Sequence, residues 1–181
     1  GYWKDVGTLS AYWEANMELI DIIPEFNLYE EFWRIYTKTD VIPPQYFSAD
    51  SKVKACIVGD GTEVYGDISN SVIGAGVVIE EGAVVTNSII MNNTVIKKGA
   101  KIEKSIIAER VEVGENTELG VFEEAENKYK PNVYSGGLVT IGEGSVIPAN
   151  VKIGKNVAIV GKTTAEDYPD GILASGESII R

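Results

Sequence analysis

Three consecutive 17-residue stretches decide the fold: DISNSVIGAGVVIEEGA (67–83), VVTNSIIMNNTVIKKGA (84–100) and KIEKSIIAERVEVGENT (101–117) align with one another without a gap. An internal repeat of this length means that the chain stacks one structural unit on the next. The repeat therefore predicts an architecture, and by itself it predicts no activity.

Aliphatic residues recur within these units mostly every six positions, and the step shortens to five once per unit. The positions are Ile73, Ile79, Val85, Ile90, Ile96, Ile102, Ile107, Val113 and Leu119, and later Ile141, Ile147, Ile153 and Ile159. A six-residue period does not keep apolar side chains on one face of an α-helix, and frequent Val, Ile and Thr favour strands. We expect an all-β fold, a parallel β-helix over 53–161 with three short strands per turn and about five coils, each coil roughly 4.8 Å from the next.

The segments outside the repeat predict a helix, a connector and a cap. In 1–20, the residues Leu9, Tyr12, Trp13, Met17 and Ile20 fall on one face of a helix, and Thr8 stands at its N-cap position. That apolar face needs a partner, which the rest of the chain need not supply. Residues 21–52 form a connector, and 162–181 form a C-terminal capping segment whose GILASGESII (171–180) predicts one or two final strands.

Two segments leave alternatives open. Phe32, Trp33, Ile35 and Tyr36 in the connector indicate a short strand or an anchored extended segment. Residues 121–137 break the repeat and predict a loop that leaves the β-helix at one corner. This loop is either a solvated insertion or a docking element for a partner chain or another domain.

Composition excludes several classes of function. The net charge is −11, with 27 acidic against 16 basic residues and no basic run, so neither a nucleic acid nor an anionic membrane is an expected partner. The absence of histidine excludes His-ligated zinc and a histidine base within this chain. A single cysteine, Cys56, forms no intrachain disulfide, and no run of 18 apolar residues occurs, so we expect a cytoplasmic location.

The first 20 residues, GYWKDVGTLSAYWEANMELI, closely resemble the final segment of the catalytic domain in bacterial glucose-1-phosphate adenylyltransferases. There, a Tyr-Trp-Lys/Arg-Asp-Val-Gly-Thr motif leads into a helix with an Ala-Asn pair, here Ala15-Asn16. Trp33 and Tyr36 then precede Pro43-Pro44, and a β-helix follows, so the resemblance covers essentially all 181 residues. The left-handed winding of the β-helix is an expectation that comes from this resemblance alone.

The resemblance implies a transfer of the adenylyl group from ATP to glucose 1-phosphate, in glycogen synthesis. It makes Asp5 a catalytic residue and one of two carboxylates that hold Mg²⁺ in the full-length enzyme; the alternative for Asp5 is the cap of a turn. The Gly-rich phosphate loop of that family is absent, so no cofactor-binding residue is expected here, and 1–20 would be the last piece of a catalytic domain. The chain alone is expected to be inactive.

The same resemblance implies an assembly and regulatory role. We expect the missing catalytic domain as a partner, a homo-oligomer (dimer or tetramer), and a sugar-phosphate effector with Arg34 and Lys38 as candidate contacts, unless both are ordinary surface charges. Two alternatives remain: another sugar-1-phosphate nucleotidyltransferase, such as a mannose-1-phosphate guanylyltransferase, and a non-catalytic regulatory paralogue. Paralogues of that kind tend to lose the metal-binding acid, which Asp5 argues against.

Overall fold

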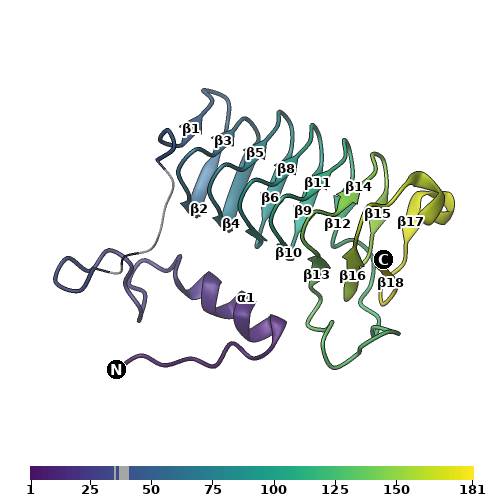
Figure 1. Ribbon diagram of the computed structural model, residues 1–181, viewed down its shortest axis with the longest axis horizontal. Coiled ribbons are helices and arrows are strands. Elements are labelled where there is room, and N and C mark those ends of the chain that lie inside the picture. The colour runs from purple at the N-terminus through teal and green to yellow at the C-terminus, as the bar shows by residue number, and fades with distance from the viewer. Residues whose placement is uncertain (35, 37–40) are drawn as a thin grey trace.

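The computed structural model describes residues 1–34, 36 and 41–181, and its largest part is a parallel β-helix with three faces (Figure 1). The first face is a six-stranded parallel sheet. Its strands are β1 (Tyr46–Phe47), β3 (Glu63–Val64), β5 (Val78–Ile79), β8 (Val95–Ile96), β11 (Glu112–Val113) and β14 (Val146–Ile147).

The other two faces are joined through two longer strands, β2 (Val53–Val58) and β4 (Asp67–Ile73), which bend across both. The second face continues with β6 (Val84–Thr86), β9 (Lys101–Glu103), β12 (Glu118–Leu119), β15 (Lys152–Ile153) and β17 (Ile172–Leu173). The third face continues with β7 (Ile89–Ile90), β10 (Ser105–Ile107), β13 (Val139–Ile141), β16 (Val157–Val160) and β18 (Ser178–Ile180). All of these strand pairs are parallel, as the repeat predicts.

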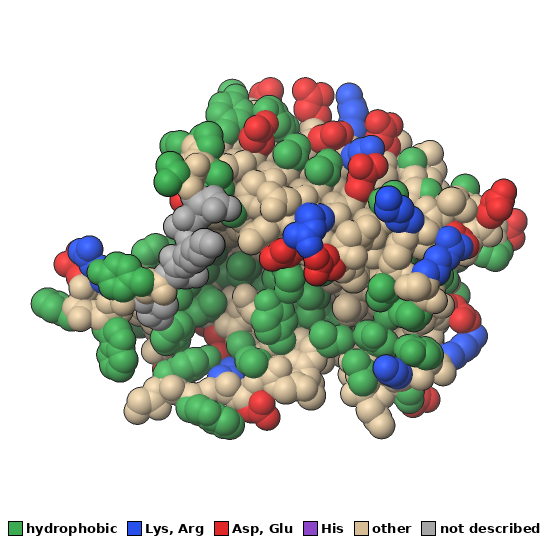
Figure 2. Space-filling model, viewed as in Figure 1, with side chains coloured by type: hydrophobic (Ala, Val, Ile, Leu, Met, Phe, Trp, Pro, Cys, Tyr) green, Lys and Arg blue, Asp and Glu red, His purple; other side chains and the backbone are tan. Residues whose placement is uncertain are grey.

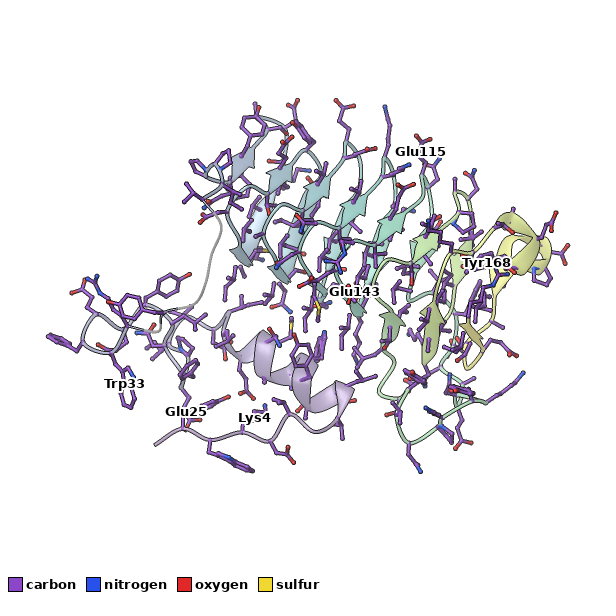
Figure 3. All side chains as sticks on the ribbon, viewed as in Figure 1. Lys4, Glu25, Trp33, Glu115, Glu143 and Tyr168 are labelled. Atoms are coloured by element: carbon purple, nitrogen blue, oxygen red, sulfur yellow. The ribbon has the colours of Figure 1, made fainter. Side chains whose placement is uncertain are left out.

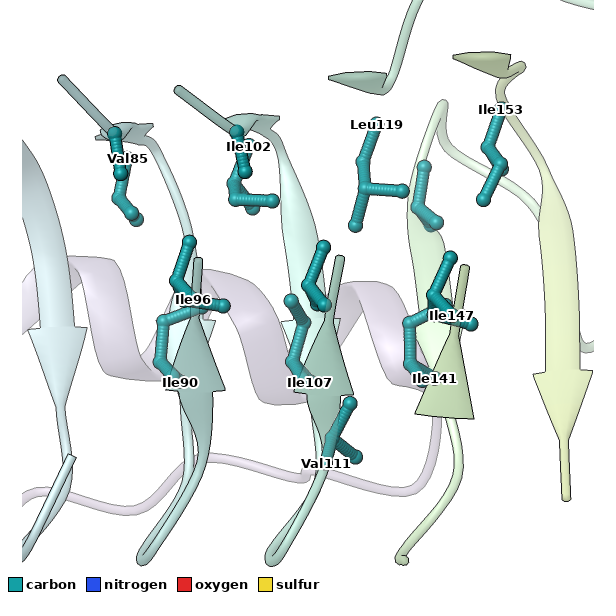
Figure 4. Packing of buried hydrophobic residues seen from close by; sticks show 14 of the residues in the cluster. Val85, Ile90, Ile96, Ile102, Ile107, Val111, Leu119, Ile141, Ile147 and Ile153 are labelled. Carbon is teal, nitrogen blue, oxygen red and sulfur yellow. The ribbon is translucent and has the colours of Figure 1, made fainter. Parts of the chain in front are cut away.

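The strand register reproduces the 17-residue repeat. Ile79 pairs with Ile96 on the first face, and Ile90 pairs with Ile107 on the third. These aliphatic side chains point inward and form one continuous core along the axis, in which Ile79, Ile96 and Ile107 have no exposed surface (Figure 4). Burial of an aliphatic residue at each face of each coil explains the six-residue period, and the prediction of a parallel β-helix is confirmed.

Small polar residues also face inward at one corner. Ser71, Ser88 and Ser105 are fully buried, and the hydroxyls of the first two accept a hydrogen bond from the next coil: the Ser88 amide donates to Ser71 Oγ at 3.1 Å, and the Ser105 amide donates to Ser88 Oγ at 3.0 Å. These buried polar groups are therefore satisfied between coils, as buried polar groups require. The aliphatic spacing alone gave no indication of this serine ladder.

The stack is longer than the five expected coils. It begins at β1, which lies within the expected connector, where the Tyr46 amide donates to the Thr62 carbonyl at 2.8 Å. It continues past residue 161, because β17 and β18 pair with β15 and β16. Two short 3-10 helices, Ala165–Asp167 and Pro169–Gly171, precede these last strands and place the buried ring of Tyr168 against the end of the core.

The connector differs from the expected anchored segment. Residues 21–34, 36 and 41–45 contain no helix or strand, and the side chains of Phe32 (99% exposed) and Trp33 (81% exposed) stand in solvent. Ile35 lies outside the described residues. Phe32 and Trp33 are therefore not packed against the described part of the chain, whereas the ring of Phe26 stacks on that of Tyr2, with 5.5 Å between the ring centres.

Candidate functional site

The motif that carries Asp5 lies directly before the helix α1 (Leu9–Glu18). Thr8 has extended backbone angles, and its Oγ1 accepts a hydrogen bond from the Ala11 amide at 3.1 Å. This contact satisfies one of the amides that a helix leaves free in its first turn. The predicted N-cap is confirmed, and it fixes the point at which the chain turns from the Asp5 segment into the helix.

The helix α1 packs on the outer surface of the third face. Leu9, Tyr12, Trp13 and Met17 contact a buried cluster of Ile89, Ile106 and Leu138. A helix of ten residues is about 15 Å long, which matches about three coil spacings, so α1 crosses successive coils along the axis of the β-helix (Figure 1). The rest of the chain does supply the partner of the apolar face. Ile20 lies beyond the end of α1 and takes no part in this cluster.

Two polar contacts fix the helix on this face. The indole Nε1 of Trp13 donates to the Asn87 carbonyl at 2.8 Å. The ammonium of Lys104 lies 5.4 Å from the centre of the Trp13 ring, a distance typical of a cation–π contact. Trp13 is therefore held by a backbone carbonyl and a cation of two neighbouring coils.

The first residues of the chain run back along α1. Lys4 forms an ion pair with Glu18, lies 4.0 Å from a carboxylate oxygen of Glu14, and sits beside the helix in Figure 3. The Tyr2 hydroxyl donates to the second Glu18 oxygen at 3.3 Å. The hydrogen bond to Glu18 raises the pKa of Lys4, and the same contact lowers the pKa of Glu18. The segment on each side of Asp5 is thus attached to α1.

Asp5 itself is exposed at this turn. Its Oδ1 accepts a hydrogen bond from the Gly7 amide at 2.9 Å, so the turn-capping role is present. A Cβ on residue 7 would lie 3.1 Å from Asp5 Oδ1, and glycine leaves the room that this turn needs. The bond to Gly7 uses one carboxylate oxygen and leaves Oδ2 to bind another group.

The described residues do not form a metal site by themselves. No group of three or more Asp, Glu, Cys or His side chains lies close enough together among residues 1–34, 36 and 41–181 to hold a metal ion. Asp5 contributes one carboxylate, whereas Mg²⁺ requires an octahedral set of oxygen ligands. Of the effector candidates, Arg34 is exposed in the connector and Lys38 lies outside the described residues.

The loop 121–137 is exposed over most of its length but is attached to the β-helix at two points. Asn127 within it and Asn156 beneath it are buried, with 2% and 4% exposure, and both bond to the backbone of the last coils and the loop. Most of the loop is exposed, as a solvated insertion would be, but these two buried asparagines attach it to its own chain, which the sequence does not indicate. No sequence pattern marks these two asparagines, because their partners are carbonyl groups 29 and 31 residues away.

Stacked parallel coils with inward aliphatic residues at six-residue spacing define a hexapeptide-type β-helix. A family model described as "GlmU-like, C-terminal hexapeptide" matches residues 43–141, and the chain belongs to this family. None of the described helices has the length and apolar character needed to cross a bilayer.

Three relatives share the name glucose-1-phosphate adenylyltransferase. The chain is 76% identical to the protein of Lachnospira eligens over all 181 residues, 56% identical to that of Thermotoga maritima over 180 residues, and 44% identical to that of Acetivibrio thermocellus over 181 residues. It spans 43%, 43% and 42% of their lengths, respectively. The resemblance drawn from the GYWKDVGT motif is thereby confirmed.

Proposed function

We propose that the chain is the β-helix portion of a glucose-1-phosphate adenylyltransferase, which converts ATP and glucose 1-phosphate to ADP-glucose and diphosphate in the cytoplasm for glycogen synthesis. The observation that carries this proposal is the 76% identity over the whole chain to the Lachnospira eligens protein of that name. The nucleotide-binding core belongs to the part of the enzyme outside this chain, so the chain alone forms no ADP-glucose.

Asp5 is proposed to be a catalytic residue of the complete enzyme and to supply one carboxylate ligand to Mg²⁺. Its exposure and the free Oδ2 support this role, and its attachment to α1 through Gly7 and Thr8 restricts its position. When bound, Mg²⁺ would stabilise charge on the phosphate oxygens of the reactants. The remaining ligands would come from the catalytic domain and the substrates.

The β-helix is proposed to serve assembly, as a dimer or a tetramer, and regulation by a sugar-phosphate effector. Support comes from the connector, where Ile22 (101% exposed), Ile23 (89%) and Phe32 (99%) are fully or almost fully in solvent. Figure 2 shows hydrophobic side chains gathered over this part of the molecule. Several exposed apolar side chains in one segment favour burial against another chain or domain. Light scattering at high protein concentration should show at least dimers, and a monomer alone would contradict the assembly role.

A chimeric enzyme tests the proposed reaction. This chain would replace the corresponding 43% of the Lachnospira eligens enzyme, and release of diphosphate from ATP and glucose 1-phosphate would be measured. The chimera should form ADP-glucose at a rate close to that of the natural enzyme, and the 181-residue chain alone should form none. A chimera that folds and assembles but stays inactive, or activity of the chain alone, would contradict the proposal.

A further inference from the structure

The side chain of Asn156 joins the two ends of the loop 121–137. Asn156 lies at the corner before β16, and its Nδ2 donates to the Ala125 carbonyl at 2.8 Å and to Glu124 Oε1 at 3.0 Å. Its Oδ1 accepts from the Gly137 amide at 2.7 Å. A single buried amide group thus binds both the outgoing and the returning segment of the loop.

A second buried amide holds the body of the loop on the last coil. Asn127 Nδ2 donates to the Asn156 carbonyl at 2.7 Å and to Ser178 Oγ at 3.0 Å. Its Oδ1 accepts from the amides of Tyr129 and Lys130 at 2.9 and 2.8 Å. All hydrogen-bonding positions of a buried amide in an otherwise exposed loop are in use, which gives the loop one defined conformation.

The returning end of the loop reaches the first turn of α1. Gly136 has a positive φ of 69°, and a Cβ on it would lie 2.7 Å from Ser10 Oγ, so the loop backbone touches the helix directly. Leu138, the next residue but one, is 1% exposed and lies in the cluster beneath α1. Between them, a Cβ on Gly137 would lie 3.6 Å from Nζ of Lys104, the cation that covers Trp13.

The helix α1 contacts the β-helix through one face only. The helix has ten residues, none of which is fully buried, and helices this short have little stability of their own. The loop contacts its N-terminal turn, and Asp5 precedes the Thr8 cap by three residues. A shift of this turn would therefore move Asp5.

We propose that the loop 121–137 is a positioning element for Asp5, with Asn156 and Gly136 as positioning residues that act through Ser10 and the first turn of α1. This inference rests on the proposed function for the role of Asp5, but its mechanical part does not. A displacement of a reacting group by about 1 Å is enough to lower a rate about 100-fold. The last coils of the β-helix would thereby set the geometry at the motif.

Hydrogen exchange of the 181-residue chain tests the mechanical part. Asn156→Gly allows the positive φ at this position, because glycine adopts it without strain, and removes the three side-chain hydrogen bonds. Asn150→Gly is the matched control, because Asn150 also has a positive φ in the same coil but is exposed at another corner. Amides of α1 should exchange at least tenfold faster in the Asn156 variant than in the unmodified chain. In the control their exchange rates should not change. Unchanged α1 exchange in a variant whose loop amides exchange faster would overturn the proposal.

A rescue experiment in the chimeric enzyme tests the link to Asp5. Gly136→Ala places a methyl group against Ser10 Oγ, and Gly82→Ala is its control, with a φ of 70° and no neighbouring atom nearer than 3.9 Å. We expect Gly136→Ala to lower kcat at least fivefold and to raise exchange in α1, and the added Ser10→Ala change to restore both. Loss of kcat without rescue, or an equal loss in Gly82→Ala, would overturn the positioning role. An inactive unmodified chimera would instead refute the proposed function, and the exchange result would still decide the mechanical part.

Discussion

Two neighbouring isoleucines of β10 allow the stability contributed by the core of the β-helix to be measured separately from that contributed by the buried cluster under α1 (Ile89, Ile106 and Leu138). Ile107 points inward, has no exposed surface, and is stacked between Ile90 and Ile141 of the adjacent coils. Ile106 points outward, is 4% exposed, and lies under α1. Each would be replaced by alanine, which removes the same three carbons from two different surroundings.

Transfer of three carbons out of water is worth about 2.4 kcal/mol, at roughly 0.8 kcal/mol for each. In Ile107→Ala the coils on both sides are fixed by parallel strand pairing, so the cavity persists and the loss of unfolding free energy should reach about 3–4 kcal/mol. In Ile106→Ala the helix can settle into the gap, which removes most of the cavity cost, so the loss should stay near the transfer value of about 2–2.5 kcal/mol, with faster amide exchange in α1.

The measurement is urea unfolding followed by far-ultraviolet circular dichroism, with the m-value compared among the variants because stacked repeats can unfold in parts. An equal m-value would allow the free energies to be compared directly. A larger loss of unfolding free energy for Ile106→Ala than for Ile107→Ala would refute this distinction between the core and the cluster under α1. A loss below about 1.5 kcal/mol for Ile107→Ala would refute it too.

Three further predictions concern the cap of α1, one corner and the end of the β-helix. Thr8→Ala removes the N-cap acceptor and should cost about 1 kcal/mol of helix stability, measured as faster hydrogen exchange of the α1 amides. Thr8→Asp keeps a capping oxygen and should keep these amides protected. Equal exchange in the two variants would contradict the capping role. In Gly66→Ala the new Cβ would overlap the Ala83 carbonyl oxygen, so this variant should melt at a lower temperature than Gly144→Ala. At Gly144 only the positive φ of 65° opposes an alanine. A lower melting temperature for Gly144→Ala would contradict the close approach of the coils at Gly66. Burial raises the pKa of Tyr168 to about 12 from 10.0, so the stabilisation that depends on its neutral form is complete below about pH 10. About 2–3 kcal/mol of unfolding free energy is then lost as the pH rises through 12. Tyr168→Phe should not show this part of the alkaline loss of stability, and a pH profile equal to that of the natural chain would contradict the prediction.

The hydroxyl of Tyr168 can be removed without leaving an unpaired donor. Thr163 Oγ1 donates its proton to the Val146 carbonyl at 2.8 Å, so in the 2.8 Å contact between the two hydroxyl groups Tyr168 must be the donor. The phenylalanine variant therefore keeps the Thr163 bond intact. Its pH profile then reports the titration of Tyr168 rather than a broken network.

The coils could be predicted from the sequence because each one repeats the same burial requirement. Ile79, Ile96 and Val113 occupy the same position in three successive units and stack in register, so one pattern is stated several times. The partner of α1 was missed, although a signal existed. Ile89-Ile90 and Ile106-Ile107 are adjacent isoleucine pairs, and two consecutive apolar residues in a strand mean that both of its surfaces are covered.

The placement of the loop and the connector could not be predicted from local patterns. Asn127 and Asn156 are buried through bonds to distant backbone groups, and no composition rule distinguishes them from asparagines at exposed corners. Aromatic residues in the connector suggested anchoring, yet Trp33 points into solvent (Figure 3). For Asp5 the family resemblance implies a catalytic, metal-binding role, and the alternative is the cap of a turn. The structure contains the capping bond from the Gly7 amide.

The most direct test of the central claim is the rate of ADP-glucose formation by the chimeric enzyme with Asp5→Asn. Asparagine retains the oxygen that accepts from the Gly7 amide and removes the negative charge, so the turn should persist while the proposed metal ligand is lost. Asp60→Asn, which changes an acid at a corner of the β-helix, is the control. We predict a fall of at least 100-fold for Asp5→Asn with unchanged assembly, and full activity for the control. Full activity of the Asp5 variant at ordinary Mg²⁺ concentrations would contradict the account.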